Sequence, residues 1–344
     1  MKDKVAIIRA DNYDDVGHKL REGIEAVGGL PDLKEKHIVI KPNLCCVKSS
    51  ETGATIHVNF VREIINIINE ETGGNCRIFV VESDAEGVNA DYAFKFLGYT
   101  SLEKDFPNVK LVNLSKDAKI EIILGGKALD TLEAPKTLLD MEYMVSIAKL
   151  KTHADQRMSC ILKNQFGLIT KKHKAVFHPI LSEVIYDLNS MYKPDLCIVD
   201  GIIGMEGFGP TDGMPKKANV ILVGTNPIAT DIVAAKIMGF KPKQVPHLRL
   251  CMKLSNYSEN DFCLMGEDVR NVQTKFQFIP LKYYLLARLG LYLQKWGTYM
   301  LNFGSFLQKT RSALSLIGFA TVNKRVALKD ILKIMKDMIF KSPG

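Results

Sequence analysis

The stretch YMVSIAKLKTHADQRMSCILKNQFG, residues 143–167, decides the fold. Its first eight residues are an apolar run of strand length, and a polar stretch with Lys151 and His153 follows directly. A helical pattern that carries Lys163 and Asn164 comes next. A short apolar run without alternation is typical of a strand inside a parallel sheet that is covered on both faces. We therefore expect a core strand that delivers hydrogen-bond donors to one edge of a sheet.

Similar apolar runs recur on both sides of this stretch and alternate with helical patterns. The expected strands span residues 5–10, 37–40, 77–83, 109–114, 143–150, 195–200 and 219–224. The expected helices span residues 14–27, 57–71, 89–97, 157–168 and 179–192, and another starts at Asn226-Pro227. Residues 119–133 are expected to form a local hairpin. The alternation predicts an α/β fold, with a doubly wound, mostly parallel sheet and helices on both faces, over residues 1–265.

Polar side chains recur where the expected strands end. They are Lys41 and Asn43, Ser83 and Asp84, Lys151 and His153, Asp200, and finally Asn226 and Asp231. In open α/β sheets, ligands bind in the crevice outside the carboxyl ends of the strands. We expect five strands to deliver these groups to the same edge.

The chemistry of this edge is expected to be basic. Between Lys149 and Lys174 there are seven Lys or Arg residues and one acid, Asp155. Ammonium groups at strand ends favour phosphate or carboxylate ligands. His153 could transfer a proton, bind a metal or donate a hydrogen bond. A solvated surface role is expected for three lysines of the following stretch, Lys171, Lys172 and Lys174.

Residues 200–213, DGIIGMEGFGPTDG, are expected to form a glycine-rich loop. The backbone N–H groups near Gly207 and Gly209 could approach an anion there. The spacing fits neither a dinucleotide-binding fingerprint nor a P-loop. The alternative is a long connection that is merely rich in turns.

Three carboxylates are candidates for binding a divalent cation or positioning a substrate. Asp200 and Glu206 flank the first half of the glycine-rich stretch. Asp231 lies in the first turn of the helix that starts at Pro227, so an equally good interpretation is that it complements the helix dipole.

Seven cysteines occur without any C-x-x-C spacing. Neither a zinc ribbon nor a ferredoxin-type iron–sulfur loop is expected. Cys45 and Cys46 are adjacent, which suits neither an ordinary disulfide nor a chelating pair. Reduced, mostly buried thiols in a cytoplasmic protein are the simplest interpretation, and no secretory signal opens the chain.

The last part of the chain differs in charge from the rest. Residues 280–344 contain eleven Lys or Arg and two Asp or Glu, whereas the other 279 residues hold 35 basic and 36 acidic groups. Residues 266–344 are therefore expected to be a separate basic, aromatic-rich helical extension. Its residues 280–320 could contact an anionic membrane surface, at the inner membrane face, or a second subunit. No run is long enough for a transmembrane helix, and nucleic acid is not an expected partner.

The chain resembles the family called domain of unknown function 362. The resemblance rests on KPNL at 41–44, KLKTH at 149–153, LKNQFG at 162–167, DGIIGMEGFGPTDG at 200–213 and TNPIATDIVAAKIMG at 225–239. It covers about residues 4–250. The resemblance implies a fold and a site made from the residues of these motifs. Some members of the family carry ferredoxin-like cysteine motifs and are described as iron–sulfur proteins, and this chain departs from them.

These observations predict an enzyme that uses a phosphorylated or carboxylated small molecule. The expected catalytic residues are His153, Lys151 and Asp200, the expected substrate-binding residues are Lys41, Asn43, Lys163, Asn164, Gly207 and Gly209, and the expected metal ligands are Glu206 and Asp231. A competing hypothesis is a redox carrier that holds a metal or cluster through Cys45, Cys46, Cys160 and Cys197. A third is a binding module recruited to a membrane surface by the basic extension.

Overall fold

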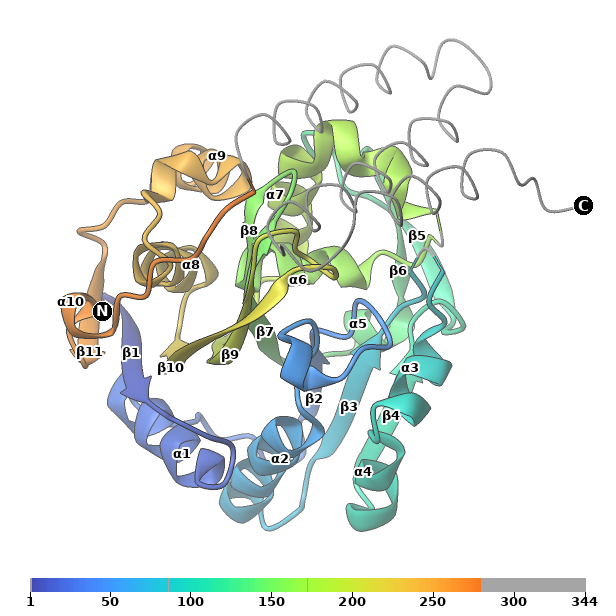
Figure 1. The fold of residues 1–344 in the computed structure, drawn as a ribbon. Coiled ribbons are helices and arrows are strands. Elements are labelled where there is room, and N and C mark those ends of the chain that lie inside the picture. The colour runs from blue at the N-terminus through green and yellow to red at the C-terminus, as the bar shows by residue number, and fades with distance from the viewer. Residues whose placement is uncertain (1, 86, 172, 280–344) are drawn as a thin grey trace, which may run out of the picture.

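A nine-stranded mixed sheet forms the centre of the structure, a computed structural model that describes residues 2–85, 87–171 and 173–279 (Figure 1). In spatial order the main path of the sheet is β11 (Phe262–Gly266), β1 (Asp3–Arg9), β10 (Met214–Gly224), β9 (Leu196–Glu206), β7 (Tyr143–His153), β2 (His37–Pro42), β3 (Arg77–Glu82) and β4 (Val109–Asn113). The short strand β8 (Arg157–Ser159) pairs with the end of β7. Among these strands, all but β8 and β10 run in the same direction. The predicted α/β fold with a mostly parallel sheet is confirmed.

Helices cover both faces of this sheet because successive strand residues point to opposite sides. Val145 belongs to the core on one face and Met144 to the core on the other. The first face packs against α1 (Val16–Val27) and α2 (Val58–Thr72). The opposite face packs against α7 (Leu181–Met191), α8 (Pro227–Ile237) and α9 (Pro246–Leu254), as Figure 1 shows.

The remaining elements complete the layers. The predicted local hairpin is present as β5 (Lys119–Ile123) and β6 (Thr131–Pro135). The shorter helices are α3 (Ala90–Phe96), α4 (Thr100–Asp105), α5 (Lys136–Leu139), α6 (Ile161–Asn164) and α10 (Val269–Val272). The predicted start of α8 is confirmed, since the side chain of Asn226 accepts the N–H groups of Ile228 and Ala229 and Pro227 opens the helix.

The direction of β10 differs from the expectation. It pairs antiparallel with both β9 and β1, so its carboxyl end lies at the opposite edge of the sheet. The reason is its connection, because β9 and β10 are joined as a hairpin and hairpin strands must be antiparallel. The expectation that five strands deliver polar groups to one edge is therefore wrong for β10, and Asn226 lies at the other edge.

Much of the expected glycine-rich loop is strand. β9 extends through Gly201 and Gly204 to Glu206, and β10 starts at Met214. A Cβ atom at Gly204 would lie 2.3 Å from the carbonyl oxygen of Leu150 on β7. The glycine therefore allows two strands to approach closely, which is the usual meaning of glycine inside a strand.

The helix expected at 157–168 is also different. Its first residues form β8, and only α6 and the 3₁₀ turn Gln165–Leu168 are helical. The residues after β11 pack back onto the main domain, where Val272 and Phe276 are buried. The segment 280–344, on which most of the predicted basic extension falls, lies outside the described residues. No helix within the described ranges is long and apolar enough to cross a membrane.

Candidate functional site

Four lysines are buried at the edge of the sheet where β2, β3 and β7 end. They are Lys41 on β2, Lys149 and Lys151 on β7, and Lys174, which contacts the residue after β3, and none is more than 6% exposed. Ammonium groups are rarely buried in proteins unless they are paired. Their partners therefore define the chemistry of this edge.

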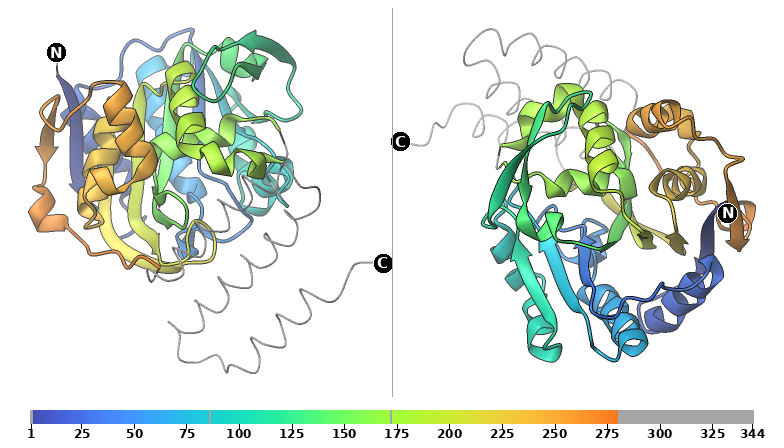
Figure 2. Two further views of the ribbon diagram at one scale, coloured as in Figure 1. Left: turned by 90° about the horizontal axis from the view of Figure 1, so that it is seen from above. Right: turned by 180° about the vertical axis from the view of Figure 1, so that it is seen from behind.

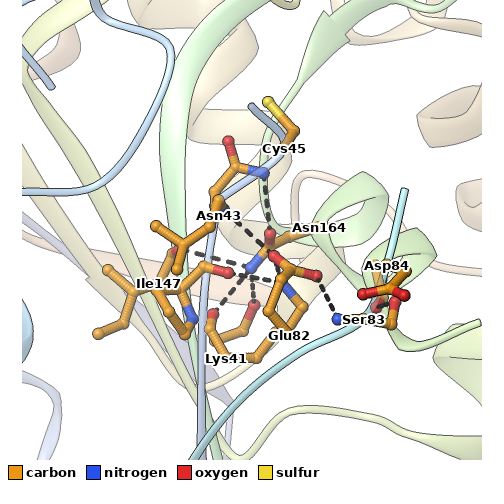
Figure 3. A network of polar contacts seen from close by, with 12 residues as sticks. Lys41, Asn43, Cys45, Glu82, Ser83, Asp84, Ile147 and Asn164 are labelled. Carbon is orange, nitrogen blue, oxygen red and sulfur yellow. Dashed lines mark hydrogen bonds and ion pairs between the residues drawn. The ribbon is translucent and has the colours of Figure 1, made fainter. Parts of the chain in front are cut away.

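Lys41 is paired inside the protein. Its ammonium group lies 2.7 Å from a carboxylate oxygen of Glu82, the last residue of β3 (Figure 3). Glu82 also accepts the backbone N–H groups of Leu44 at 3.2 Å and Ser83 at 3.0 Å. The charge that was expected to hold a substrate is thus balanced by a carboxylate of the neighbouring strand.

Asn164 joins α6 to β2 and β7. Its side-chain amide donates to the carbonyl oxygen of Lys41 and to the hydroxyl of Ser146, both at 3.0 Å. Its amide oxygen accepts from the side chain of Asn43 at 3.2 Å, which leaves the buried amide oxygen of Asn43 without a hydrogen-bond partner among the described residues (Figure 3). The structure therefore brings Lys41, Asn43 and Asn164, three of the expected substrate-binding residues, into contact with one another.

Asp200 belongs to a second network on the face covered by α1. Its carboxylate lies 2.6 Å from the ammonium group of Lys149, and it accepts the hydroxyl of Tyr13 at 3.0 and 3.1 Å. Burial lowers the pKa of Lys149, against the attraction of Asp200, which raises it. Burial and the adjacent Asp200 raise the pKa of Tyr13. The ring of His57 stacks on Tyr13 at 5.1 Å, and burial lowers the pKa of its imidazole.

Lys151 has no carboxylate partner in the part of the chain that the structure describes. Its ammonium group donates to the carbonyl oxygen of Ala54 at 2.8 Å and to the sulfur of Cys45 at 3.1 Å. Both partners lie in the loop after β2. This loop can lie close to β9 because Gly53 has a positive φ of 75°, and a Cβ atom there would lie 2.0 Å from the carbonyl oxygen of Gly204.

Lys174 likewise has no carboxylate partner in the described ranges. It donates to the hydroxyl of Ser83 at 2.6 Å, and that hydroxyl donates to the carbonyl oxygen of Gly167. Burial lowers the pKa of Lys174 to about 8. The expectation of a solvated surface role was therefore wrong for this residue, although Lys171 is exposed as expected.

His153 is the last residue of β7, where it pairs with Arg157 of β8 at the turn that joins the two strands. It is 3% exposed, and its Nδ1 atom accepts the backbone N–H groups of Asp155 at 3.1 Å and Gln156 at 3.3 Å. These bonds hold the turn. Lys163 lies with its ammonium group over the ring of Phe166, 5.2 Å from the centroid.

The predicted glycines and carboxylates have structural partners of their own. The N–H group of Gly207 donates to the carbonyl oxygen of Gln277, and a Cβ atom at Gly209 would lie 2.0 Å from the carbonyl oxygen of Thr152. The carboxylate of Glu206 accepts the N–H group of Gln277 and lies 3.5 Å from Lys216.

Asp231 is fully buried on α8, away from Glu206 and Asp200. Its carboxylate accepts the N–H groups of Ile161 at 2.8 Å and Leu162 at 3.2 Å, at the start of α6. The structure therefore does not bring the three candidate carboxylates together. Within the described ranges no group of three or more His, Cys, Asp or Glu residues could hold a metal ion.

Fold and site together define the class, an α/β protein with a cluster of buried lysines at the carboxyl ends of parallel strands. The chain belongs to the family "Domain of unknown function (DUF362)", whose sequence model matches residues 38–236, so the predicted resemblance is confirmed. It is 25% identical over 263 residues to a thylakoid-associated protein of Synechocystis sp.. This alignment covers 72% of this chain and 78% of the relative.

A solved structure was also found. It is the lactate racemase apoprotein from Thermoanaerobacterium thermosaccharolyticum, with a TM-score of 0.43 and 12% identity. The match covers 70% of this chain but only 57% of that one.

Proposed function

We propose that this protein is an enzyme that binds a phosphorylated or carboxylated small molecule at the carboxyl ends of β2, β3 and β7. The observation that carries the proposal is the imbalance of charge at this edge. Of the four lysines buried among the described residues, Lys41 and Lys149 are paired with carboxylates, whereas Lys151 and Lys174 have no carboxylate partner within those ranges. An unpaired buried ammonium group is costly, and an anionic ligand would provide the missing negative charge.

In this proposal Lys174 holds the anionic group of the ligand, and Lys151 lies at the carboxyl end of β7 in the same site. The pairs Lys41–Glu82 and Lys149–Asp200 hold the surrounding strands in place. Asn43 lies beside them with one unused amide oxygen, which could accept a hydrogen bond from a hydroxyl group of the ligand.

The test is binding of simple anions to the full-length protein. Pyrophosphate and citrate serve as probes, and calorimetry and thermal melting are the measurements. We expect one of them to bind and to raise the melting temperature. Replacing Lys174→Met should weaken binding about 10- to 100-fold, the loss expected for a hydrogen bond to a charged group. The exposed Lys171→Met is the matched control and should bind as the wild type does.

The pH dependence gives an independent check. The pKa of Lys174 is lowered to about 8, so its ammonium form is lost as the pH rises through that value. Affinity for the anion should therefore fall between pH 7 and pH 9 in the wild type, and less so in Lys174→Met. If neither anion binds, or if Lys171→Met weakens binding as much as Lys174→Met, the proposal is wrong.

We also propose that residues 280–320 bring the protein to an anionic membrane surface. Two observations favour this. No acidic residue occurs between Asp268 and Asp330, and the Synechocystis relative is called a thylakoid-associated protein. Polybasic segments gain about 1 kcal/mol per Lys or Arg near such a surface. The full chain should float with liposomes that contain anionic lipid, and a chain ending at residue 279 should not. Equal flotation of both would exclude the proposal, and self-association of the full chain alone would favour a second subunit as the partner.

A further inference from the structure

Cys45 differs from the other cysteines in its surroundings. Its side chain is only half-buried, whereas Cys46, Cys160, Cys197 and Cys251 are buried. Burial raises the pKa of Cys160, Cys197 and Cys251. A thiol in a closed apolar site is unreactive, so these three are inert components of the core.

The ammonium group of Lys151 donates to the sulfur atom of Cys45 at 3.1 Å, and the adjacent thiol of Cys46 interacts with the same sulfur. In its thiol form Cys45 donates to the carbonyl oxygen of Ala54, 3.7 Å away. The hydrogen bond from Cys46 and the positive charge of Lys151 lower the pKa of Cys45 well below its ordinary value. The same contact raises the pKa of Cys46, so Cys45 is the one of the two thiols that ionises first. The thiolate, and not the thiol, is the nucleophilic form of cysteine.

The buried ammonium group gives a second, independent reason for a thiolate. Lys151 is 1% exposed and has no carboxylate partner among the described residues. Its other partner, the carbonyl oxygen of Ala54, carries no net charge. The nearest atom that can supply a full negative charge is therefore the sulfur of Cys45. Such a Lys–Cys pair is one of the arrangements that activate a nucleophilic cysteine.

We propose that Cys45 is the nucleophile of this site and attacks the carbonyl carbon of an anionic aldehyde or ketone. The sulfur lone pair forms the C–S bond, and the electrons of the C=O double bond move to the oxygen. The oxygen then takes a proton from the ammonium group of Lys151, which leaves a thiohemiacetal and a neutral amine. Lys174 would hold the anionic group of the same molecule, and this part of the inference rests on the proposed function.

The test uses alkylation of the intact full-length protein, followed by mass spectrometry of its peptides. Iodoacetamide is the neutral probe, and the exposed Cys263 of the same chain is the internal control. An ordinary thiol has a pKa of about 8.5, so its rate rises roughly tenfold per pH unit below that value. We expect the alkylation rate of Cys45 to change by less than about twofold from pH 7 to pH 9, because it is already a thiolate, and the rate at Cys263 shows how an exposed thiol of the same chain responds over that range. A parallel rise at both residues would overturn the inference.

Variants identify the cause. Lys151→Met should slow the alkylation of Cys45 at pH 7 at least about tenfold and restore the ordinary pH dependence. Cys46→Ala should act in the same direction, and it decides the matter should Lys151→Met fail to fold. Unchanged rates at Cys45 in a folded variant would show that neither neighbour activates it.

Iodoacetate separates the inference from the proposed function, because it is the negatively charged counterpart of iodoacetamide. If the alkylation rate of Cys45 is independent of pH and iodoacetate clearly prefers Cys45 to Cys263, both the nucleophilic cysteine and the anion site are supported. If the rate is independent of pH but iodoacetate shows no such preference, the nucleophilic cysteine is supported and the anion site is refuted. Finally, ¹³C-labelled glyoxylate should give a thiohemiacetal resonance with the wild type and none with Cys45→Ala, and the absence of the resonance in both would refute a carbonyl substrate.

Discussion

The buried pair Lys149–Asp200 gives a prediction that can be worked out from its contacts. In Asp200→Asn the shape of the side chain is retained and its charge is removed. The carboxylate is 0% exposed and lies 2.6 Å from an ammonium group that is also 0% exposed. Breaking a buried pair by removing one partner costs about 3–5 kcal/mol, because the other charge stays buried and uncompensated. Asparagine can still accept hydrogen bonds from Tyr13 and Ile202, so we expect a loss near the lower limit, about 3 kcal/mol.

The assay is urea unfolding followed by circular dichroism at pH 7. Asp140→Asn makes the same chemical change in the exposed pair Lys136–Asp140, and it should lower the free energy of unfolding by no more than about 0.5 kcal/mol. Lys149→Met added to Asp200→Asn removes the buried charge and should restore part of the loss. If Asp200→Asn is as stable as Asp140→Asn, this result refutes the argument that the buried pair Lys149–Asp200 stabilises the fold.

The variant should also change the pH dependence of stability. Burial already lowers the pKa of Lys149 and only Asp200 raises it, so without the carboxylate the pKa falls further. Unfolded lysine titrates near its ordinary value of about 10.4. Between the two pKa values the unfolded chain binds more protons, and the free energy of unfolding rises with pH by up to about 1.4 kcal/mol per unit. Asp200→Asn should thus regain stability from pH 7 toward pH 10, and a flat profile would contradict this.

Three further substitutions test other parts of the structure by thermal melting and urea unfolding. His153→Ala should lower the free energy of unfolding by about 2 kcal/mol, since the buried N–H groups of Asp155 and Gln156 lose their acceptor. If the stability is unchanged and turnover is lost, a catalytic role of His153 is supported instead. Asp231→Ala should destabilise by about 1–3 kcal/mol and Asp231→Asn by less, because asparagine can still accept an N–H group at the start of α6; equal losses would contradict this role. Gly53→Ala should destabilise by more than about 1 kcal/mol, since alanine is strained at positive φ and its Cβ atom would clash with Gly204; a variant of wild-type stability would show that the loop can move away from β9.

Seven strands of the sheet were predicted from the sequence, whereas the short strands β8 and β11 and the direction of β10 were not. Apolar runs such as VAIIRA and NVILVG show that a segment is buried on both faces, and both are strands. Such a run looks the same in either direction, so periodicity could not show that β10 is reversed. The signal available was the connection after β9, because a parallel crossover needs a dozen or more residues and usually a helix.

The site was only partly predictable for a similar reason. The motifs contained Lys41, Asn43 and Asn164, which the structure brings into contact where β2 ends, whereas their expected role in substrate binding stays a prediction. The partners of the buried charges were not predicted from the sequence. They are Glu82, which pairs with Lys41, and Tyr13, which contacts Lys149 and Asp200. Sequence spacing shows which charges reach an edge, but which of them neutralise each other depends on contacts between distant segments. Lys174 illustrates this, because its burial is due to packing near Ser83 and Gly167.

The position of β1 has a consequence for the synthesis of the chain. This strand leaves the ribosome before the other strands of the sheet, and it pairs on one side with β10 and on the other with β11, which ends at Gly266 (Figure 2). At about 5–20 residues per second, these partners follow it by roughly 10–50 s. Throughout that interval both edges of an apolar strand are unpaired, and exposed edges of this kind are templates for aggregation. The nascent protein therefore depends on α1, which follows β1 directly and packs against it, or on a chaperone, to protect its first strand until the last one arrives.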